Sequence, residues 1–320
     1  MTAKPLAYLV RLGISLAIFG LLITALDLQE IGALFKNIDV VWVLISFSFL
    51  VALRMLMMVR WQILLQAHDI NVPIFTIFKI TMISAPMGPI LPAGLGIDLV
   101  RGYEVSKYSG KLKETALTLL EDRIVGVYSM IALATVMAVV AEAIGQSTGL
   151  LWIVLGAHVG FIAVVYGFAY HSRSLQSLLL KRLPSKIADK TGKIIEALLD
   201  MRSIREKIIS LIVISVAIQV FRALMYFALY KSVGFAAPLS YYFVYIPIVL
   251  LIIMIPISIG GLGLREAGLV AFFTPLGIAS EVSITAGIMA HVIEIAFALP
   301  GLVWFMLPQK RLPKAHDPNR

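Results

Sequence analysis

The chain has 320 residues, of which 60% are hydrophobic and 14% are charged, and its mean hydropathy is +0.95. A soluble protein of this length could not bury so much apolar side chain, so the composition predicts an all-α polytopic membrane protein. The chain has no cysteine, which excludes disulfides and cysteine metal sites, and its net charge of +9 lies in connections between apolar segments rather than in a patch suited to nucleic acid.

Residues 1–149 form the first predicted half, with full spans at Leu6–Leu26, Val40–Val59 and Ile124–Ala141. Between the last two spans, Pro73–Leu95 is apolar but contains Lys79 and several prolines. Because proline interrupts helices, we expect a broken-helix hairpin that enters the membrane and returns to the same side. The polar connections are then Arg60–Asn71 and Ile97–Arg123, and Trp61 suits a membrane interface.

Residues 150–308 form the second predicted half, with full spans at Leu150–Tyr170, Ile208–Tyr230 and Ile284–Leu307. A second broken-helix hairpin is expected at Tyr241–Gly277. The long basic connection His171–Lys207 has apolar residues at helical spacing between its lysines, which is typical of an amphipathic helix on the membrane surface. The basic tail, residues 309–320, is predicted to be disordered.

Two similar motifs lie inside the predicted hairpins. Residues 89–101 read PILPAGLGIDLVR, and residues 255–266 read IPISIGGLGLRE. Arg54 lies 40 positions before Gly94, and Arg222 lies 39 positions before Gly261. The matched spacing indicates an internal repeat, as in transporters built from two inverted halves.

The distribution of cations supports this topology. With six full spans and two re-entrant hairpins, 21 of the 27 lysines and arginines lie on one side, two on the other and four within apolar segments. This asymmetry predicts that both termini are cytoplasmic and that the chain lies in the plasma (inner) membrane. The alternative is eight straight spans.

The hairpin motifs carry the candidate binding residues. Glycine lets the backbone approach a ligand closely, the first amides of a half-helix lack helical partners, and arginine binds phosphate through two parallel hydrogen bonds. The expected phosphate-binding residues are Gly94, Gly96, Asp98, Arg101, Gly260, Gly261, Gly263, Arg265 and Glu266. The residues expected to line the cavity or join its ion network are Arg54, Glu121, Asp122, Arg123, Arg222, His291 and Glu294.

Structural roles compete with these interpretations. Arg265 could pair with Glu266 alone, Arg54 could extend to the interface, and Arg222 could form a structural ion pair. Residues 121–123 could close an ion network with Arg101 or form a solvated helix start. His291 and Glu294, three residues apart, could relay protons or balance Arg265, but they are too few for a metal site. We expect no cofactor.

At these motifs the chain resembles the transmembrane, flippase-like domain of the lysylphosphatidylglycerol synthase family. The resemblance covers nearly the whole chain and rests on residues 256–266, 94–101 and 121–126. In the first motif, Ala93 and Ile97 stand where the family often has glycine.

This resemblance implies a membrane domain that moves lipids between leaflets. In the full synthase, a separate soluble domain transfers an aminoacyl group from tRNA to phosphatidylglycerol. The sequence ends at Arg320 without such a domain, so we do not expect that transferase activity.

The leading hypothesis is therefore a translocase for a membrane phospholipid or a polyprenyl-phosphate-linked lipid. Gly110-Lys111 lacks the rest of a phosphate loop, so ATP hydrolysis is not expected. One alternative is an intramembrane enzyme of lipid or lipid-linked glycan synthesis, with Glu121, Asp122, His291 and Glu294 as acid–base candidates. Another is an accessory subunit that binds a membrane synthase through the basic connection 171–207.

Overall fold

The computed structural model describes residues 28–87, 95–146, 148–164, 206–235, 237–255 and 257–306. Within these ranges the regular structure is entirely helical, as expected for an all-α membrane protein. The predicted first span at residues 6–26, the amphipathic helix near residues 187–198, the basic tail and Gly94 lie outside the described residues.

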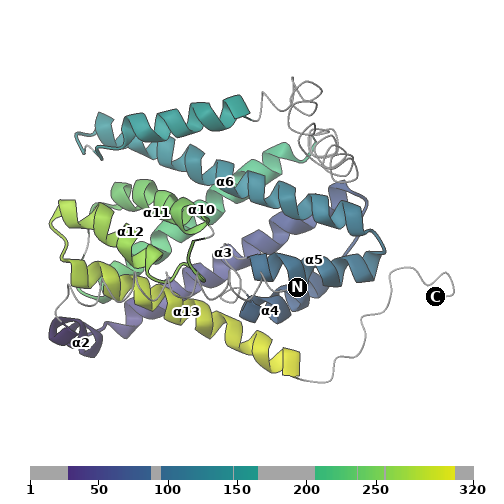
Figure 1. Cartoon of the computed structure of the whole chain (residues 1–320), viewed down its shortest axis with the longest axis horizontal. Coiled ribbons are helices and arrows are strands. Elements are labelled where there is room, and N and C mark those ends of the chain that lie inside the picture. Colours follow the sequence, from purple (N-terminus) through teal and green to yellow (C-terminus); the bar gives the residue numbers. More distant parts are fainter. Residues whose placement is uncertain are drawn as a thin grey trace, which may run out of the picture.

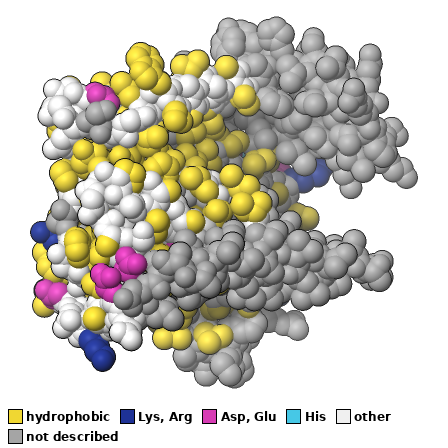
Figure 2. Space-filling model, turned by 60° about the vertical axis from the view of Figure 1, so that its left-hand side comes forward, with side chains coloured by type: hydrophobic (Ala, Val, Ile, Leu, Met, Phe, Trp, Pro, Cys, Tyr) yellow, Lys and Arg dark blue, Asp and Glu magenta, His cyan; other side chains and the backbone are white. Residues whose placement is uncertain are grey.

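Four described helices are long and apolar enough to cross a membrane. They are α3 (Val40–Ala67), α6 (Leu112–Ala143), α10 (Ile208–Ser232) and α13 (Ser280–Met306). The helices α3 and α10 pack along each other through the middle of the molecule, with α6 and α13 on opposite sides of this pair (Figure 1). Hydrophobic side chains dominate the described part of the face shown in Figure 2, which suits contact with lipid.

Two long helices extend beyond their predicted bounds. The helix α3 continues through Arg60 and Trp61 to Ala67, so the predicted connection at 60–71 is wrong for most of its length. Trp61 is fully buried rather than interfacial. Likewise α6 begins at Leu112, and the predicted polar connection 97–123 consists largely of helix. Polar residues occur inside both helices because they pair with each other in the protein interior.

In each half two short helices pack together at or beside the predicted hairpin. In the first half the predicted hairpin 73–95 holds only α4 (Ile74–Ser84) and η1 (Ala85–Met87), and their partner α5 (Leu95–Ser109) occupies the start of the predicted polar connection, so the predicted end of this hairpin is wrong. In the second half they are α11 (Leu239–Ile253) and α12 (Leu264–Phe273), which is followed by η3 (Thr274–Leu276). At 1.5 Å per residue, helices of this length are shorter than the roughly 30 Å hydrocarbon core. The predicted helix breaks are therefore present, while the six-span count and the inverted repeat stay predictions.

Glycines permit the close approach within each hairpin. A Cβ atom on Gly96 would collide with the carbonyl oxygen of Met87, across the first hairpin. A Cβ atom on Gly268 would lie 3.2 Å from the methyl groups of Val249, across the second. Between α11 and α12, Gly260, Gly261 and Gly263 have φ values of 60°, 80° and 77°, a region that L-residues with a side chain rarely adopt.

Two further helices complete the described chain. The helix α2 (Leu28–Lys36) lies between the predicted spans 6–26 and 40–59, and it packs near α13. The described part of the predicted span 150–170 is the apolar helix Leu151–Val164, which runs beside α6 at the upper edge of Figure 1. An aromatic cluster of Tyr230, Tyr242 and Phe273 fixes the second hairpin against α10, with ring centroids 4.7 to 5.4 Å apart.

Candidate functional site

A cavity of about 190 Å³ lies where α3, α5, α6 and α10 meet. Its wall contains five arginines and two aspartates, a formal charge of +3. These residues are Arg54, Arg60, Arg101, Arg123, Arg222, Asp98 and Asp122. Around them the wall is formed by apolar and amide side chains that include Met57, Ile218 and Gln219. The cavity is therefore a concentrated cationic site inside an apolar helix bundle.

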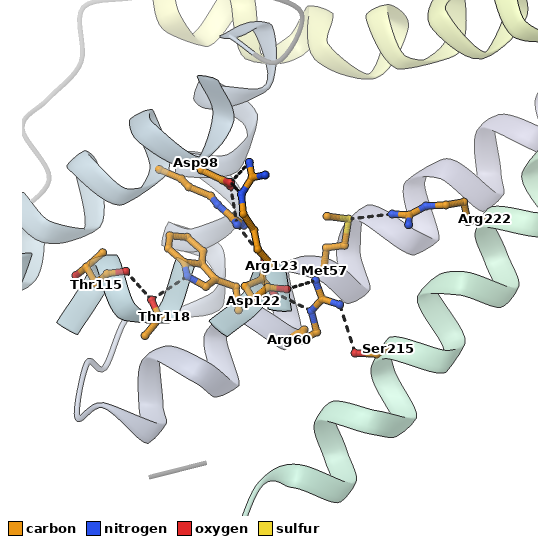
Figure 3. Close-up of polar contacts among 11 residues, drawn as sticks. Met57, Arg60, Asp98, Thr115, Thr118, Asp122, Arg123, Ser215 and Arg222 are labelled. Carbon is orange, nitrogen blue, oxygen red and sulfur yellow. Dashed lines mark hydrogen bonds and ion pairs between the residues drawn. The ribbon is translucent and has the colours of Figure 1, made fainter. Parts of the chain in front are cut away.

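Asp122 of α6 is the central acid of this cavity. Its Oδ1 accepts a hydrogen bond from Arg60 Nε at 2.7 Å, and its Oδ2 accepts one from Arg101 Nη2 at 2.9 Å (Figure 3). All three side chains are buried. Arg60 also donates to Ser215 Oγ of α10 at 3.3 Å, so this one arginine joins three helices. The carboxylate holds α3, α5 and α6 together at the cavity.

Asp98 of α5 is the second acid. One oxygen lies 2.8 Å from Arg101 Nη2, and the other lies 2.5 Å from Arg123 Nη2 of α6. Two carboxylates are thus shared among three guanidinium groups. The network retains one net positive charge even when every ion pair is formed.

Trp61 and Gly126 shape the space around these arginines. The Trp61 ring lies 4.6 Å from the guanidinium carbon of Arg101, an arrangement suited to a cation–π interaction, and its Nε1 donates to Thr118 Oγ1 at 3.2 Å. A Cβ atom on Gly126 would be 3.4 Å from Arg60 Nη2, an ordinary contact distance, so the backbone of α6 passes close beside the guanidinium without excluding an alanine.

The two remaining arginines of the cavity have weaker partners. Arg222 of α10 donates to Gln219 Oε1 at 3.0 Å. It also approaches Met57 Sδ at 4.0 Å (Figure 3). The guanidinium of Arg54 lies 5.7 Å from the Phe297 ring of α13, and its Nε is buried without a hydrogen-bond partner. Among the described residues, no carboxylate forms an ion pair with either arginine.

A second charged cluster lies in the other half. Arg265 at the start of α12 donates to Glu294 Oε2 of α13 at 3.1 Å, rather than pairing with Glu266 alone. Glu266 accepts from the Gly263 backbone amide at 2.8 Å, and its other oxygen lies 3.2 Å from His291 Nε2. The Gly263 amide that the sequence suggested for phosphate is therefore occupied by Glu266. In this conformation the cluster stabilises the turn between α11 and α12.

Several buried donors of the second cluster lack acceptors within the described part of the chain. They are Arg265 Nε and Nη1, Tyr226 Oη and Ser258 Oγ. Tyr226 and Ser258 are each 1% exposed, so water does not readily satisfy them. These groups do not line the 190 Å³ cavity, and so the structure separates the predicted residues into two centres.

Glu121 does not join either centre. Its carboxylate lies 2.9 Å from Nε2 of His68, the residue that follows α3. This hydrogen bond raises the pKa of His68 above its ordinary value, and the charges of Glu121, Glu114 and Asp69 act in the same direction. His68 and Glu121 form a separate contact between α3 and α6, away from the predicted Arg101 network.

Sequence reasoning missed Arg60, Gln219 and Met57 as cavity residues. Arg60 was counted as a loop cation, although the apolar residues Ile63, Leu64 and Leu65 that follow it indicate that the helix continues. Three of the 21 cations assigned to one side in fact line the cavity, namely Arg60, Arg101 and Arg123. Removing them leaves 18 against two, so the asymmetry that predicts topology persists.

The two centres have a common arrangement. In each half, the arginine of the hairpin pairs with an acid on the next long helix: Arg101 with Asp122, and Arg265 with Glu294. In each half, a second arginine on the preceding long helix, Arg54 or Arg222, lines the cavity. These matching positions are compatible with an internal repeat, which stays a prediction.

The helices and the buried charges define an integral membrane protein with a cationic cavity between α3, α5, α6 and α10. The family model described as the lysylphosphatidylglycerol synthase TM region matches residues 8–301, and the chain belongs to this family of membrane proteins in lipid handling. No curated protein and no solved structure matches the chain.

Proposed function

We propose that the protein is a lipid translocase that binds the phosphate of a lipid head group in the arginine-lined cavity, while the lipid tails stay in the bilayer. The observation that carries the proposal is the excess of five arginines over two aspartates in a cavity between long apolar helices. The lipid is a phospholipid or a lipid-linked intermediate, in agreement with the family's place in lipid handling.

The cost of the buried charges supports a bound anion. An arginine at the centre of a membrane helix costs about 2.5–3.5 kcal/mol on the insertion scale. Asp98 and Asp122 offset this cost for their three partners, but Arg54 and Arg222 have no carboxylate partner among the described residues. A phosphate about 4 Å away would contribute about 4 kcal/mol per charge pair at an effective dielectric constant of 20.

The repeated hairpins support movement rather than static binding. Each half has a short-helix pair joined to a long helix by an arginine–acid contact, and glycines with positive φ lie at the second turn. We propose that one half rocks against the other around the cavity and opens it alternately to each leaflet, as in inverted-repeat transporters. The proposal includes cytoplasmic termini and the inner membrane, and the concentration of cations in the connections on one side supports it.

The geometry favours this function over an intramembrane enzyme. The acid–base candidates Asp122 and Glu294 are each bound by arginine, Glu121 by His68, and the candidates belong to separate clusters. A general acid or base needs a free proton position near substrate, which these pairings do not offer. A synthase partner that docks on residues 171–207 is compatible with a translocase, and co-purification from native membranes tests it.

The test is translocation of head-group-labelled lipids by the purified chain in proteoliposomes. Arg222→Gln is the informative variant, because Arg222 has no carboxylate partner that its loss would leave exposed to an apolar environment. Loss of one charge-assisted contact of about 1.5–3 kcal/mol predicts a fall in rate of about tenfold or more. Lys113→Gln removes an exposed cation of α6 and serves as the control. Unchanged transport by folded Arg222→Gln protein would refute this mechanism.

A further inference from the structure

We infer that the cavity selects phosphate head groups with a net negative charge, above all phosphate monoesters and diphosphates, over zwitterionic head groups that carry an amine. This inference rests on the proposed function and names the substrate class of the same cavity. It follows from which charges in the cavity wall are already paired and which are not.

Both acids of the cavity are fully engaged. Asp122 uses one oxygen for Arg60 and the other for Arg101. Asp98 uses one oxygen for Arg101 and the other for Arg123. An ammonium group of a lipid would have to displace a guanidinium from one of these carboxylates, and it would lie among five arginines. The cavity therefore offers a poor site for choline, ethanolamine or an aminoacyl group.

The unmatched charged groups are all donors, and the one unmatched hydroxyl among the described wall residues, Thr81 Oγ1, can also donate. Arg222 contacts only the Gln219 amide oxygen and the weakly accepting sulfur of Met57. Arg54 and Arg101 each have a buried Nε without an acceptor among the described residues. Arg54 and Arg222 thus leave two positive charges for a ligand to balance, and the shared network adds a third.

This charge matches a phosphate monoester better than a diester. A monoester carries about −1.5 to −2 at pH 7 and presents three acceptor oxygens, whereas a diester such as phosphatidylglycerol carries one negative charge. A diphosphate presents still more acceptors. The expected order of binding is phosphatidic acid first, phosphatidylglycerol second and phosphatidylcholine last.

The test measures binding of short-chain lipids to the full chain purified in detergent, at pH 7 and constant ionic strength. Dihexanoyl phosphatidic acid, phosphatidylglycerol and phosphatidylcholine are compared, with inorganic phosphate as the soluble source of the same chemistry. We expect at least tenfold tighter binding of phosphatidic acid than of phosphatidylcholine. Tight binding of inorganic phosphate alone would support the phosphate chemistry but assign the site to a soluble anion.

The double variant Arg54→Gln/Arg222→Gln should reduce the preference to less than threefold. Lys107→Gln/Lys113→Gln removes two exposed cations and should leave the preference unchanged. If the double variant does not elute as a monodisperse protein, Arg222→Gln alone is used and should at least halve the preference. Equal binding of phosphatidic acid and phosphatidylcholine by the unmodified chain would overturn the inference.

Binding and translocation assays together distinguish a failure of the lipid selectivity from a failure of the proposed translocase function. Anion-selective binding without translocation of any lipid in proteoliposomes would refute the translocase and support the selectivity. Translocation of phosphatidylcholine as fast as phosphatidic acid would support the translocase and refute the selectivity.

Discussion

Replacing Asp122 with asparagine is expected to destabilise the protein strongly and to make its stability depend on anionic lipid. The carboxylate is 4% exposed and lies 2.7 Å from Arg60 Nε and 2.9 Å from Arg101 Nη2. Removing one member of a buried ion pair costs about 3–5 kcal/mol, because the partner stays buried and unpaired. That is a large part of the roughly 5–15 kcal/mol that stabilises a typical domain. Here two arginines lose the same partner.

The same change raises the formal charge of the cavity from +3 to +4. If the cavity binds an anion, a phosphate-bearing lipid should restore more stability to the Asp122→Asn protein than it adds to the unmodified chain. The assay is thermal unfolding in detergent, with and without short-chain phosphatidic acid. Glu142→Gln, at the exposed end of the same helix, is the control and should change stability by less than about 1 kcal/mol.

Two results would refute this reasoning. An Asp122→Asn protein as stable as the Glu142→Gln protein without lipid would mean that the carboxylate does not hold the helices together. Equal stabilisation of the Asp122→Asn protein and the unmodified chain by phosphatidic acid would mean that the charge of the cavity does not affect lipid binding. A double-mutant cycle with Arg60→Gln separates the contribution of that pair, since coupled residues are not additive.

The remaining predictions concern backbone approach and pH. Gly96→Ala should destabilise the folded protein by about 1–3 kcal/mol or more, because the new Cβ atom would overlap the Met87 carbonyl oxygen. Gly126→Ala is the control and should change the free energy of unfolding by less than about 1 kcal/mol in the same unfolding assay. His68, whose pKa is raised chiefly by its hydrogen bond to Glu121, should stabilise the protein fully below about pH 6.5 and lose this contribution as pH rises through the raised pKa. His68→Gln should flatten the pH dependence of the unfolding temperature between about pH 6 and 8, and an unchanged slope would contradict the assignment.

The helix breaks could be predicted because their cause is local. Proline combined with clustered glycine disfavours a continuous helix, and the two motifs at residues 89–101 and 255–266 contain both. Proline alone is a weaker signal, since Pro247 and Pro300 lie inside α11 and α13. The interior position of Arg101 and Arg265 was predictable for a similar reason, since an arginine next to such a turn in an apolar segment needs an acid, a cavity or a ligand.

The composition of the cavity could not be predicted because it depends on contacts between distant segments. Arg60 follows the apolar segment 40–59, in which Arg54 is the one charged residue, so it resembles the cation at the end of a span, but its partner Asp122 lies 62 residues later on another helix. Nor does the sequence distinguish the paired Arg101 from Arg222, whose nearest partners include Met57, 165 residues away. Whether an arginine finds an acidic partner depends on how α3 packs against α10, which the sequence alone does not give.

The pairing pattern also indicates how the two charged clusters differ in net charge. Arg101 shares its acids with Arg60 and Arg123, so the first half brings three guanidinium groups to two carboxylates. In the second half, Glu294 and Glu266 face Arg265 and His291, so acids there match or exceed the fixed cations. An anion placed between the halves would therefore be attracted toward the first-half network and repelled by the second-half carboxylates. The network of α3, α5 and α6 thus keeps a surplus positive charge that the cluster of Arg265 and His291 lacks, and this difference would give the phosphate of the proposed function a defined position.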